Sequence, residues 1–151
     1  MTCVSHGQPS VRTYKDDCAL GFQSESTHLS LLNDCFEDDF KKLPRYHSMD
    51  FEGSTCWIEM KTRVGISSKT FPSMMVPMSK ILFALHTKKP VYFVFVLTDG
   101  VFYSKFDAAK YFYYGDAVWC RQDRPDHKDT PQRYCFIPTE DLDWIAKYES
   151  T

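Results

Sequence analysis

The chain has 151 residues, of which 43% are hydrophobic and 25% charged, a balance typical of one globular domain with a sizeable core. Its formal net charge of −2 excludes a protein that a global basic field holds on nucleic acid. No stretch approaches the roughly 20 apolar residues of a membrane span, and no signal-peptide core is present. The six cysteines lack CxxC or zinc spacing, so we expect an intracellular protein in a reducing compartment, without a membrane partner.

Residues 1–23 are polar and mixed, which predicts an irregular N-terminal arm ahead of a single domain over residues 24–151. A helix is expected from Ser24, which could cap it, because apolar residues follow at helical spacing as far as Phe36. The arm and the helix therefore meet at the boundary that we assign to the domain.

A short edge strand is predicted over Phe40–Tyr46, because Pro44 cannot occupy a central strand position. Lys41, Lys42 and Arg45 form a small basic cluster in this segment. Two interpretations stay open: lysines that protect a sheet edge, or contacts to a phosphate backbone.

A turn that leads into an alternating strand follows the basic cluster. Asp50 precedes a Gly-Ser turn signal, and residues 56–62 then alternate. Glu59 and Lys61 share one face of this strand, whereas the opposite face is apolar. Two carboxylates and one ammonium group are therefore expected to converge at the end of a sheet. Carboxylate oxygens suit Mg²⁺ or Mn²⁺, and a nearby lysine suits a phosphate.

The segment after Arg63 is a polar connection, after which Pro77 fits the first turn of a helix with an apolar stripe. Residues 91–97 form a continuous apolar run, typical of a strand buried on both faces. Strand, helix and strand in this order predict a parallel βαβ crossover. We therefore expect the strand at 56–62 and the strand at 91–97 to be parallel neighbours.

A tight turn is predicted at Thr98-Asp99-Gly100, with residues 101–106 returning antiparallel. The aromatic cluster Tyr111–Tyr114 could stack bases or pack in the core. A charged loop follows over residues 121–133, and Thr139 is expected to cap a last helix.

Asp50, followed by Glu59-Met60-Lys61 after a hydrophobic lead-in, resembles the active-site signature of the PD-(D/E)XK nuclease superfamily. The proline that often precedes the first aspartate is replaced by Met49. The resemblance implies an α/β fold: a restriction-endonuclease-like mixed β-sheet with a parallel βαβ crossover flanked by helices, plus a C-terminal hairpin and helix extension. The motif, the crossover helix and the hairpin are also similar to nuclease-like proteins encoded by large DNA viruses, which adds virion association as an expectation.

By the same resemblance the chain is a Mg²⁺-dependent endonuclease, or uses Mn²⁺, and hydrolyses phosphodiester bonds of nucleic acid, with DNA favoured over RNA. Asp50, Glu59 and the backbone carbonyl of Met60 would hold the metal, and Lys61 would act on the attacking water. The first helix of the resembled fold often carries a further glutamate. Glu25 is the better-placed candidate, and Glu37 is the alternative; either could instead be a helix-terminal acid.

Basic side chains near the expected site are candidates for contact with nucleic acid. They are Lys41, Lys42, Arg45, Arg63, Lys80, Arg121 and Arg124. The resemblance also suggests that Lys80 supports the site from the helix after the motif, although an exposed helix lysine explains it equally. The alternative function is a catalytically silent nuclease-fold binding or virion-structural module, and a homodimer stays open.

Overall fold

The computed structural model describes residues 13–120, 126 and 130–148. In chain order its helices and strands are α1 (Tyr14–Phe36), β1 (Lys41–Lys42), β2 (Phe51–Glu52), β3 (Trp57–Thr62), β4 (Ser73–Pro77), α2 (Met78–His86), β5 (Val91–Leu97), β6 (Gly100–Lys105), α3 (Ala108–Tyr114), β7 (Asp116–Trp119), β8 (Gln132–Pro138), the 3₁₀ turn η2 (Thr139–Asp141) and β9 (Asp143–Lys147). Within these ranges, no helix has both the length and the apolar character needed to cross a bilayer.

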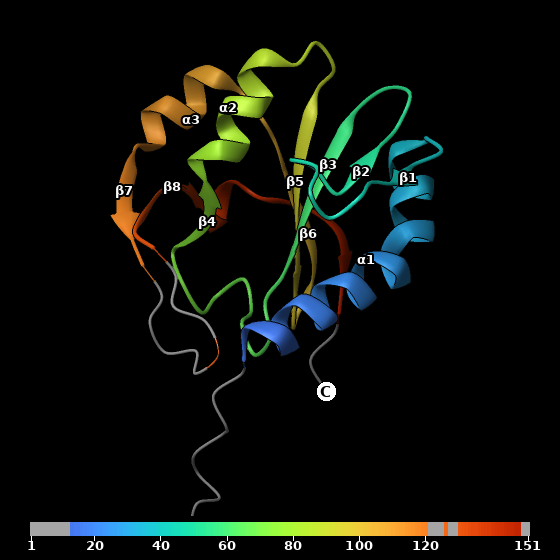
Figure 1. Cartoon of the computed structure of the whole chain (residues 1–151), viewed down its shortest axis with the longest axis horizontal. Coiled ribbons are helices and arrows are strands. Elements are labelled where there is room, and N and C mark those ends of the chain that lie inside the picture. The colour runs from blue at the N-terminus through green and yellow to red at the C-terminus, as the bar shows by residue number, and fades with distance from the viewer. Residues whose placement is uncertain (1–12, 121–125, 127–129, 149–151) are drawn as a thin grey trace, which may run out of the picture.

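Two sheets organise the fold (Figure 1). The larger has six strands in the order β1-β2-β3-β5-β6-β9, and the smaller has three in the order β4-β8-β7. Helix α1 covers one face of the larger sheet, whereas α2, α3 and the smaller sheet lie over the other face. The predicted α/β class with a mixed sheet is confirmed.

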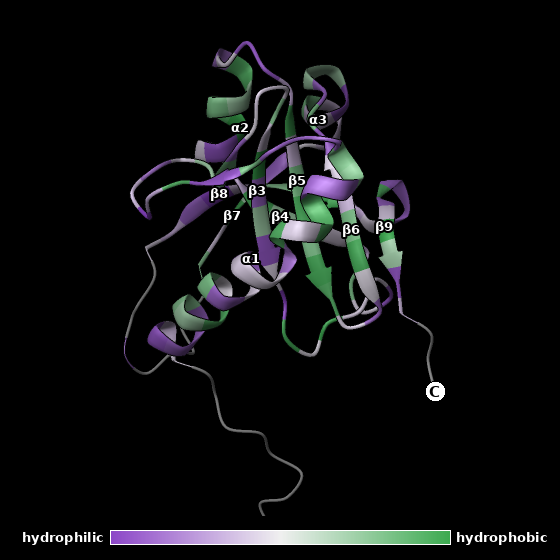
Figure 2. Cartoon of the chain, turned by 90° about the vertical axis from the view of Figure 1, so that its right-hand side faces the viewer, coloured by the Kyte–Doolittle hydropathy of each residue, from purple (hydrophilic) through white to green (hydrophobic). Residues whose placement is uncertain are grey.

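The middle of the larger sheet places the motif strand beside the most apolar strand. β3 pairs in parallel with β5, with Glu59 opposite Phe93 and Lys61 opposite Phe95. Helix α2 lies in the connection between these strands, together with β4. β5 returns antiparallel into β6 through Thr98 and Asp99. Figure 2 shows β5 as a hydrophobic strand inside the molecule, which agrees with its burial on both faces.

Helix α1 begins earlier than the sequence analysis predicts. The Thr13 side chain accepts a hydrogen bond from the Asp16 backbone, and the Asp16 side chain accepts one from the Thr13 backbone. This capping box starts the helix at Tyr14, so the expectation of an irregular arm is wrong for residues 14–23. The remainder of the expected arm, residues 1–12, lies outside the described part of the chain. Ser24 is therefore an interior helix residue and not a cap.

A second unexpected element is strand β4, in the segment that the sequence analysis assigns to a polar connection. Its buried residues Met74 and Val76 face the core formed with β8, where Ile137 and Cys135 are the paired residues. The alternation is only five residues long, so tertiary packing decides it.

The expected C-terminal helix is wrong. Thr139 to Asp141 make a single 3₁₀ turn, and the chain then extends as β9, which pairs antiparallel with β6. The N–H and C=O groups along the free edge of β6 need hydrogen-bond partners, and a strand supplies them whereas a helix does not. The aromatic cluster forms helix α3, in which Tyr111 is buried and Phe112 and Tyr113 are exposed.

Candidate active site

Strand β3 presents two charged side chains on the face that looks toward α2. Lys61 Nζ lies 2.8 Å from Glu59 Oε2, and Lys80 Nζ of α2 lies 3.6 Å from the same oxygen. The alternate residues Ile58 and Met60 are buried in the cluster under α1. The period of two along a strand therefore separates an apolar face from a face with an acid between two amines.

Asp50 is held against the same strand by two hydrogen bonds. Its backbone N–H donates to the Ile58 carbonyl at 3.0 Å, and its Oδ2 accepts from the Met60 backbone N–H at 2.7 Å. Because the N–H and C=O of one strand residue point to the same edge, the Met60 carbonyl is directed to the edge where Asp50 lies. The turn through Gly53 thus brings Asp50 back beside residues that follow it by ten positions.

Glu25 approaches Asp50 from α1. It lies in the middle of this helix, not in the first turn that the sequence analysis assigns to it, and its carboxyl group is within hydrogen-bonding reach of the Asp50 carboxyl group. The neighbouring Ser24 Oγ accepts a 2.6 Å hydrogen bond from Thr62 Oγ1 at the end of β3. This bond fixes the crossing of α1 over β3 next to Glu25.

Burial dominates the electrostatics of these three acids. It raises the pKa of Glu59, and the neighbouring Asp50 charge adds to this, whereas Lys61 and Lys80 oppose it. Burial also raises the pKa of Asp50 and of Glu25. The Glu59 side chain is only 2% exposed, and its Oε1 has no hydrogen-bond partner in the described part of the chain. A buried carboxylate oxygen without a partner is costly unless a cation or donor reaches it.

These residues form a donor set that suits a hard divalent cation. Asp50 and Glu59 supply carboxylate oxygens, Met60 supplies a carbonyl, and the orphan Glu59 Oε1 still needs a positive partner. No group of three or more His, Cys, Asp or Glu side chains in the described ranges has an arrangement that could hold a metal ion. The donor set therefore fits only if the third oxygen ligand is the main-chain carbonyl.

A groove of about 740 Å³ opens beside Lys61. It is bounded by α1 at Gly21, by the segment after β3 at Arg63, and by the smaller sheet at Trp119 and Tyr134. Trp119 is 42% exposed. The sequence analysis does not identify these aromatic residues at the groove. They come to lie there only because β4 and β7 belong to the smaller sheet, which local sequence patterns do not predict.

The remaining candidates are placed as follows. Lys42 Nζ lies 3.2 Å from the Phe22 ring centroid and donates to the Phe22 carbonyl, and the Arg45 guanidinium lies 5.1 Å from the same ring. Lys41 is exposed on β1. Arg121 and Arg124 lie outside the described residues.

The alternative to Glu25 is not brought to the site. Glu37 is the C-cap of α1, with φ of 52°, and is exposed. His47 stacks on Trp57 with ring centroids 5.5 Å apart and accepts a hydrogen bond from the Met49 backbone. Lys80, in contrast, contacts Glu59 and donates to the Ser48 carbonyl, so it lies at the site and not on an open helix face.

Comparison with known proteins gives one family. No curated protein and no solved structure matches the chain. A family model described as "Phage putative PDDEXK endonuclease" matches residues 15–145, which run from the first turn of α1 into β9. The chain therefore belongs to this phage PD-(D/E)XK endonuclease family.

Proposed function

We propose that the protein is a metal-dependent endonuclease that hydrolyses phosphodiester bonds in DNA. The observation that carries the proposal is the meeting of Asp50, Glu59 and Lys61 at strand β3 of the larger sheet, with a buried Glu59 oxygen that has no hydrogen-bond partner among the described residues. Membership of the endonuclease family supports nuclease activity in general. The groove supports a nucleic-acid substrate, because it opens to solvent and is lined by Lys61 and its neighbour Met60.

In this proposal Asp50, Glu59 and the Met60 carbonyl hold Mg²⁺ or Mn²⁺. When bound, the cation would withdraw charge from the phosphate and make a water molecule easier to deprotonate. Asp50 is already oriented by the Met60 N–H, so little side-chain entropy remains to be lost on cation binding. Two nearby amines, Lys61 and Lys80, favour the ionised form of Glu59 and so oppose the burial that raises its pKa.

Lys61 has the role of a positioning and charge-stabilising group. Its side chain contacts Glu59 and also lines the groove, so it can reach a phosphate while it stays paired with the acid. It would orient the attacking water and offset the charge that develops when the water oxygen bonds to phosphorus and a sugar oxygen leaves. Glu25, beside Asp50 and with a raised pKa, is suited to accept the proton that the water loses.

Contacts to the substrate outside the reacting phosphate are assigned to the basic residues around the site. Arg63 lines the same groove as Lys61, and the basic cluster of Lys41, Lys42 and Arg45 lies on β1 and the loop after it. We assign the phosphate contact first to Arg63, because it lines the groove, and to Lys41, because it is exposed.

A cleavage assay tests this function. Plasmid and oligonucleotide DNA should be cut in Mg²⁺ or Mn²⁺, and EDTA should abolish cutting. Lys61→Ala should be inactive, whereas Lys88→Ala, a variant of an exposed lysine at the far end of β5, should act as wild type. Cation binding without cleavage of DNA or RNA would contradict the proposal and favour a silent binding module.

A further inference from the structure

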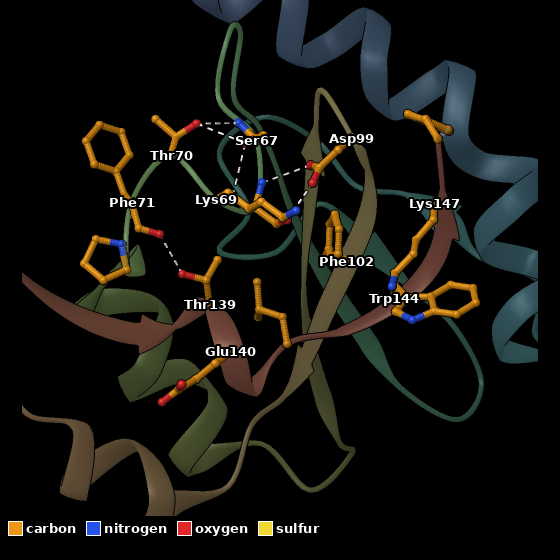
Figure 3. A pocket seen from close by; sticks show the side chains of 14 residues that line it. Ser67, Lys69, Thr70, Phe71, Asp99, Phe102, Thr139, Glu140, Trp144 and Lys147 are labelled. Atoms are coloured by element: carbon orange, nitrogen blue, oxygen red, sulfur yellow. Dashed lines mark hydrogen bonds between the residues drawn. The ribbon is translucent and has the colours of Figure 1, made fainter. Parts of the chain in front are cut away.

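A second cleft lies on the other side of the segment that follows β3 (Figure 3). It has a volume of about 1010 Å³ and separates the loop at residues 67–72 from β9. Figure 3 shows Phe71 and Trp144 on opposite sides of it, with Lys69 and Asp99 between them and Lys147 beside Trp144. We call it the Lys69–Lys147 cleft. None of the groups at the candidate active site lines it.

Hydrogen bonds hold the walls of the cleft in place. The Ser68 backbone and hydroxyl groups both donate to the Asp99 carboxylate, at 2.9 and 2.5 Å. At the other end of the loop, Thr139 Oγ1 donates to the Phe71 carbonyl at 2.7 Å. The loop is therefore tied to the β5–β6 turn and to η2, and the cleft is formed before any ligand arrives.

The lining combines aromatic faces with two lysine side chains. Trp144 is 55% exposed and Phe71 is 52% exposed. Lys147 Nζ lies 5.0 Å from the Trp144 ring centroid, and in the described part of the chain neither Lys147 nor Lys69 makes an ion pair. The Asp99 carboxylate accepts two hydrogen bonds from Ser68, and the Lys69 charge acts on it without forming an ion pair in the described residues. An aromatic ring next to lysine amines suits a ligand with a flat base and a phosphate.

The position of the cleft connects it to the active-site groove. Phe71 and Pro72 line both cavities, so one residue pair separates the cleft from the groove that holds Lys61. A strand bound at Lys61 that passes over the exposed Phe71 ring enters the cleft. Duplex DNA keeps its bases stacked inside and would present no base to Trp144, so an unpaired strand fits this path.

We propose that the Lys69–Lys147 cleft binds the single-stranded part of the nucleic-acid substrate, with a base on Trp144 and phosphates at the two lysines. The inference rests on the proposed nuclease function in that its ligand is the substrate of that site. It adds a requirement that the active site alone does not impose: an unpaired segment next to the cleaved bond.

Binding measured in EDTA tests this cleft independently of cleavage, because the chelator removes the divalent cation that cleavage would need. We would measure the anisotropy of a labelled oligothymidylate of about eight nucleotides with wild type, Trp144→Ala and Lys69→Ala/Lys147→Ala. Trp144→Ala should weaken binding roughly 5- to 100-fold, as expected for the loss of one stacked base. The double lysine variant should lower the slope of log affinity against log salt by about 1.4, the value for two single-strand phosphate contacts. Blunt duplex DNA should show neither effect.

Controls keep the result interpretable. Lys88→Ala removes an exposed lysine far from the cleft and should bind as wild type, and Trp144→Phe should recover most of the stacking. Circular dichroism melts would identify a variant that has merely lost its fold. Wild-type binding by both cleft variants overturns the inference, and equal weakening with blunt duplex overturns the single-strand assignment. In both cases, cleavage by the wild type in Mg²⁺ still leaves the proposed nuclease function standing.

Discussion

Lys61 Nζ lies 2.8 Å from Glu59 Oε2, while the buried Glu59 Oε1 has no hydrogen-bond partner within the described part of the chain. One oxygen of the acid is therefore neutralised inside the protein and the other is left for a ligand. This arrangement separates two roles that substitution can test, because an amine is not a ligand for a hard cation.

Lys61→Ala should abolish most DNA cleavage, by about 100-fold or more, and leave Mn²⁺ affinity within a few-fold of wild type. The physical reason is that Lys80 still lies 3.6 Å from Glu59 and keeps part of its charge compensated. Isothermal titration with Mn²⁺ and single-turnover cleavage should be run on the same preparations. A large loss of Mn²⁺ affinity together with cleavage would show that Lys61 acts through Glu59 and not on the phosphate.

Asp50→Asn should weaken cation binding and cleavage together, because it deletes a negatively charged oxygen from the donor set. In EDTA the same change should raise the free energy of unfolding by about 1 kcal/mol, since Glu25 and Glu59 then face a neutral neighbour. The Asn side-chain oxygen can still accept the Met60 N–H bond. Urea unfolding in EDTA measures the effect. A variant that is less stable than wild type would contradict the claim that these neighbouring carboxylates repel one another.

Thr62→Val tests whether the link between α1 and β3 positions Glu25. It removes the 2.6 Å hydrogen bond to Ser24, which is only 7% exposed, so the free energy of unfolding should fall by about 1–2 kcal/mol. Cleavage should fall about tenfold, and the pH profile of the rate should shift, because Glu25 loses its fixed place beside Asp50. Thr27→Val, which removes an exposed hydroxyl bond within α1, is the matched control. An unchanged pH profile would mean that the link is only structural.

The sequence predicts the motif strand well because its signal is local. Period-two alternation from residues 56 to 62 places Glu59 and Lys61 on one face, and the apolar run at residues 91–97 identifies the strand beside it. The place of Glu25 is different. It depends on where a helix crosses the sheet, and the Thr62–Ser24 bond that sets the crossing joins residues 38 positions apart.

The elements that the sequence analysis misses have weak local signals. The Thr13–Asp16 capping box was available as a start signal for α1, but the helix after it has little apolar periodicity in its first half. Strands β4 and β9 are five residues each and form because sheet edges and the core need partners. Trp144 of the cleft lies on β9, and Trp119 and Tyr134 of the groove belong to the smaller sheet that β4 completes, so the groove and the cleft could not be predicted from the sequence.

Asp38 lies outside the group of acids at the candidate active site, and it leads to a prediction of how stability depends on pH. Its carboxylate accepts hydrogen bonds from the backbone and hydroxyl groups of Ser54 and Thr55, and a Cβ atom at Gly53 would overlap it. Burial acts to raise the pKa of Asp38, but the hydrogen bonds from Thr55 and Ser54 prevail and hold the pKa well below its usual range. The folded state therefore binds this proton less tightly than the unfolded chain.

A depressed pKa contributes stability that is fully present above the unfolded value of about 4 and is lost as the pH falls further. Asp38→Asn should lower the free energy of unfolding by about 1–2 kcal/mol at neutral pH, because the partly solvated carboxylate loses its charge-assisted hydrogen bonds. The difference from wild type should shrink below about pH 4. Asp39→Asn, at an exposed neighbour, is the matched control and should leave the free energy of unfolding at neutral pH close to that of wild type. Urea unfolding at neutral pH and near pH 3 measures both variants, and a difference that grows toward acid would contradict the role of these bonds in holding the turn between β2 and β3.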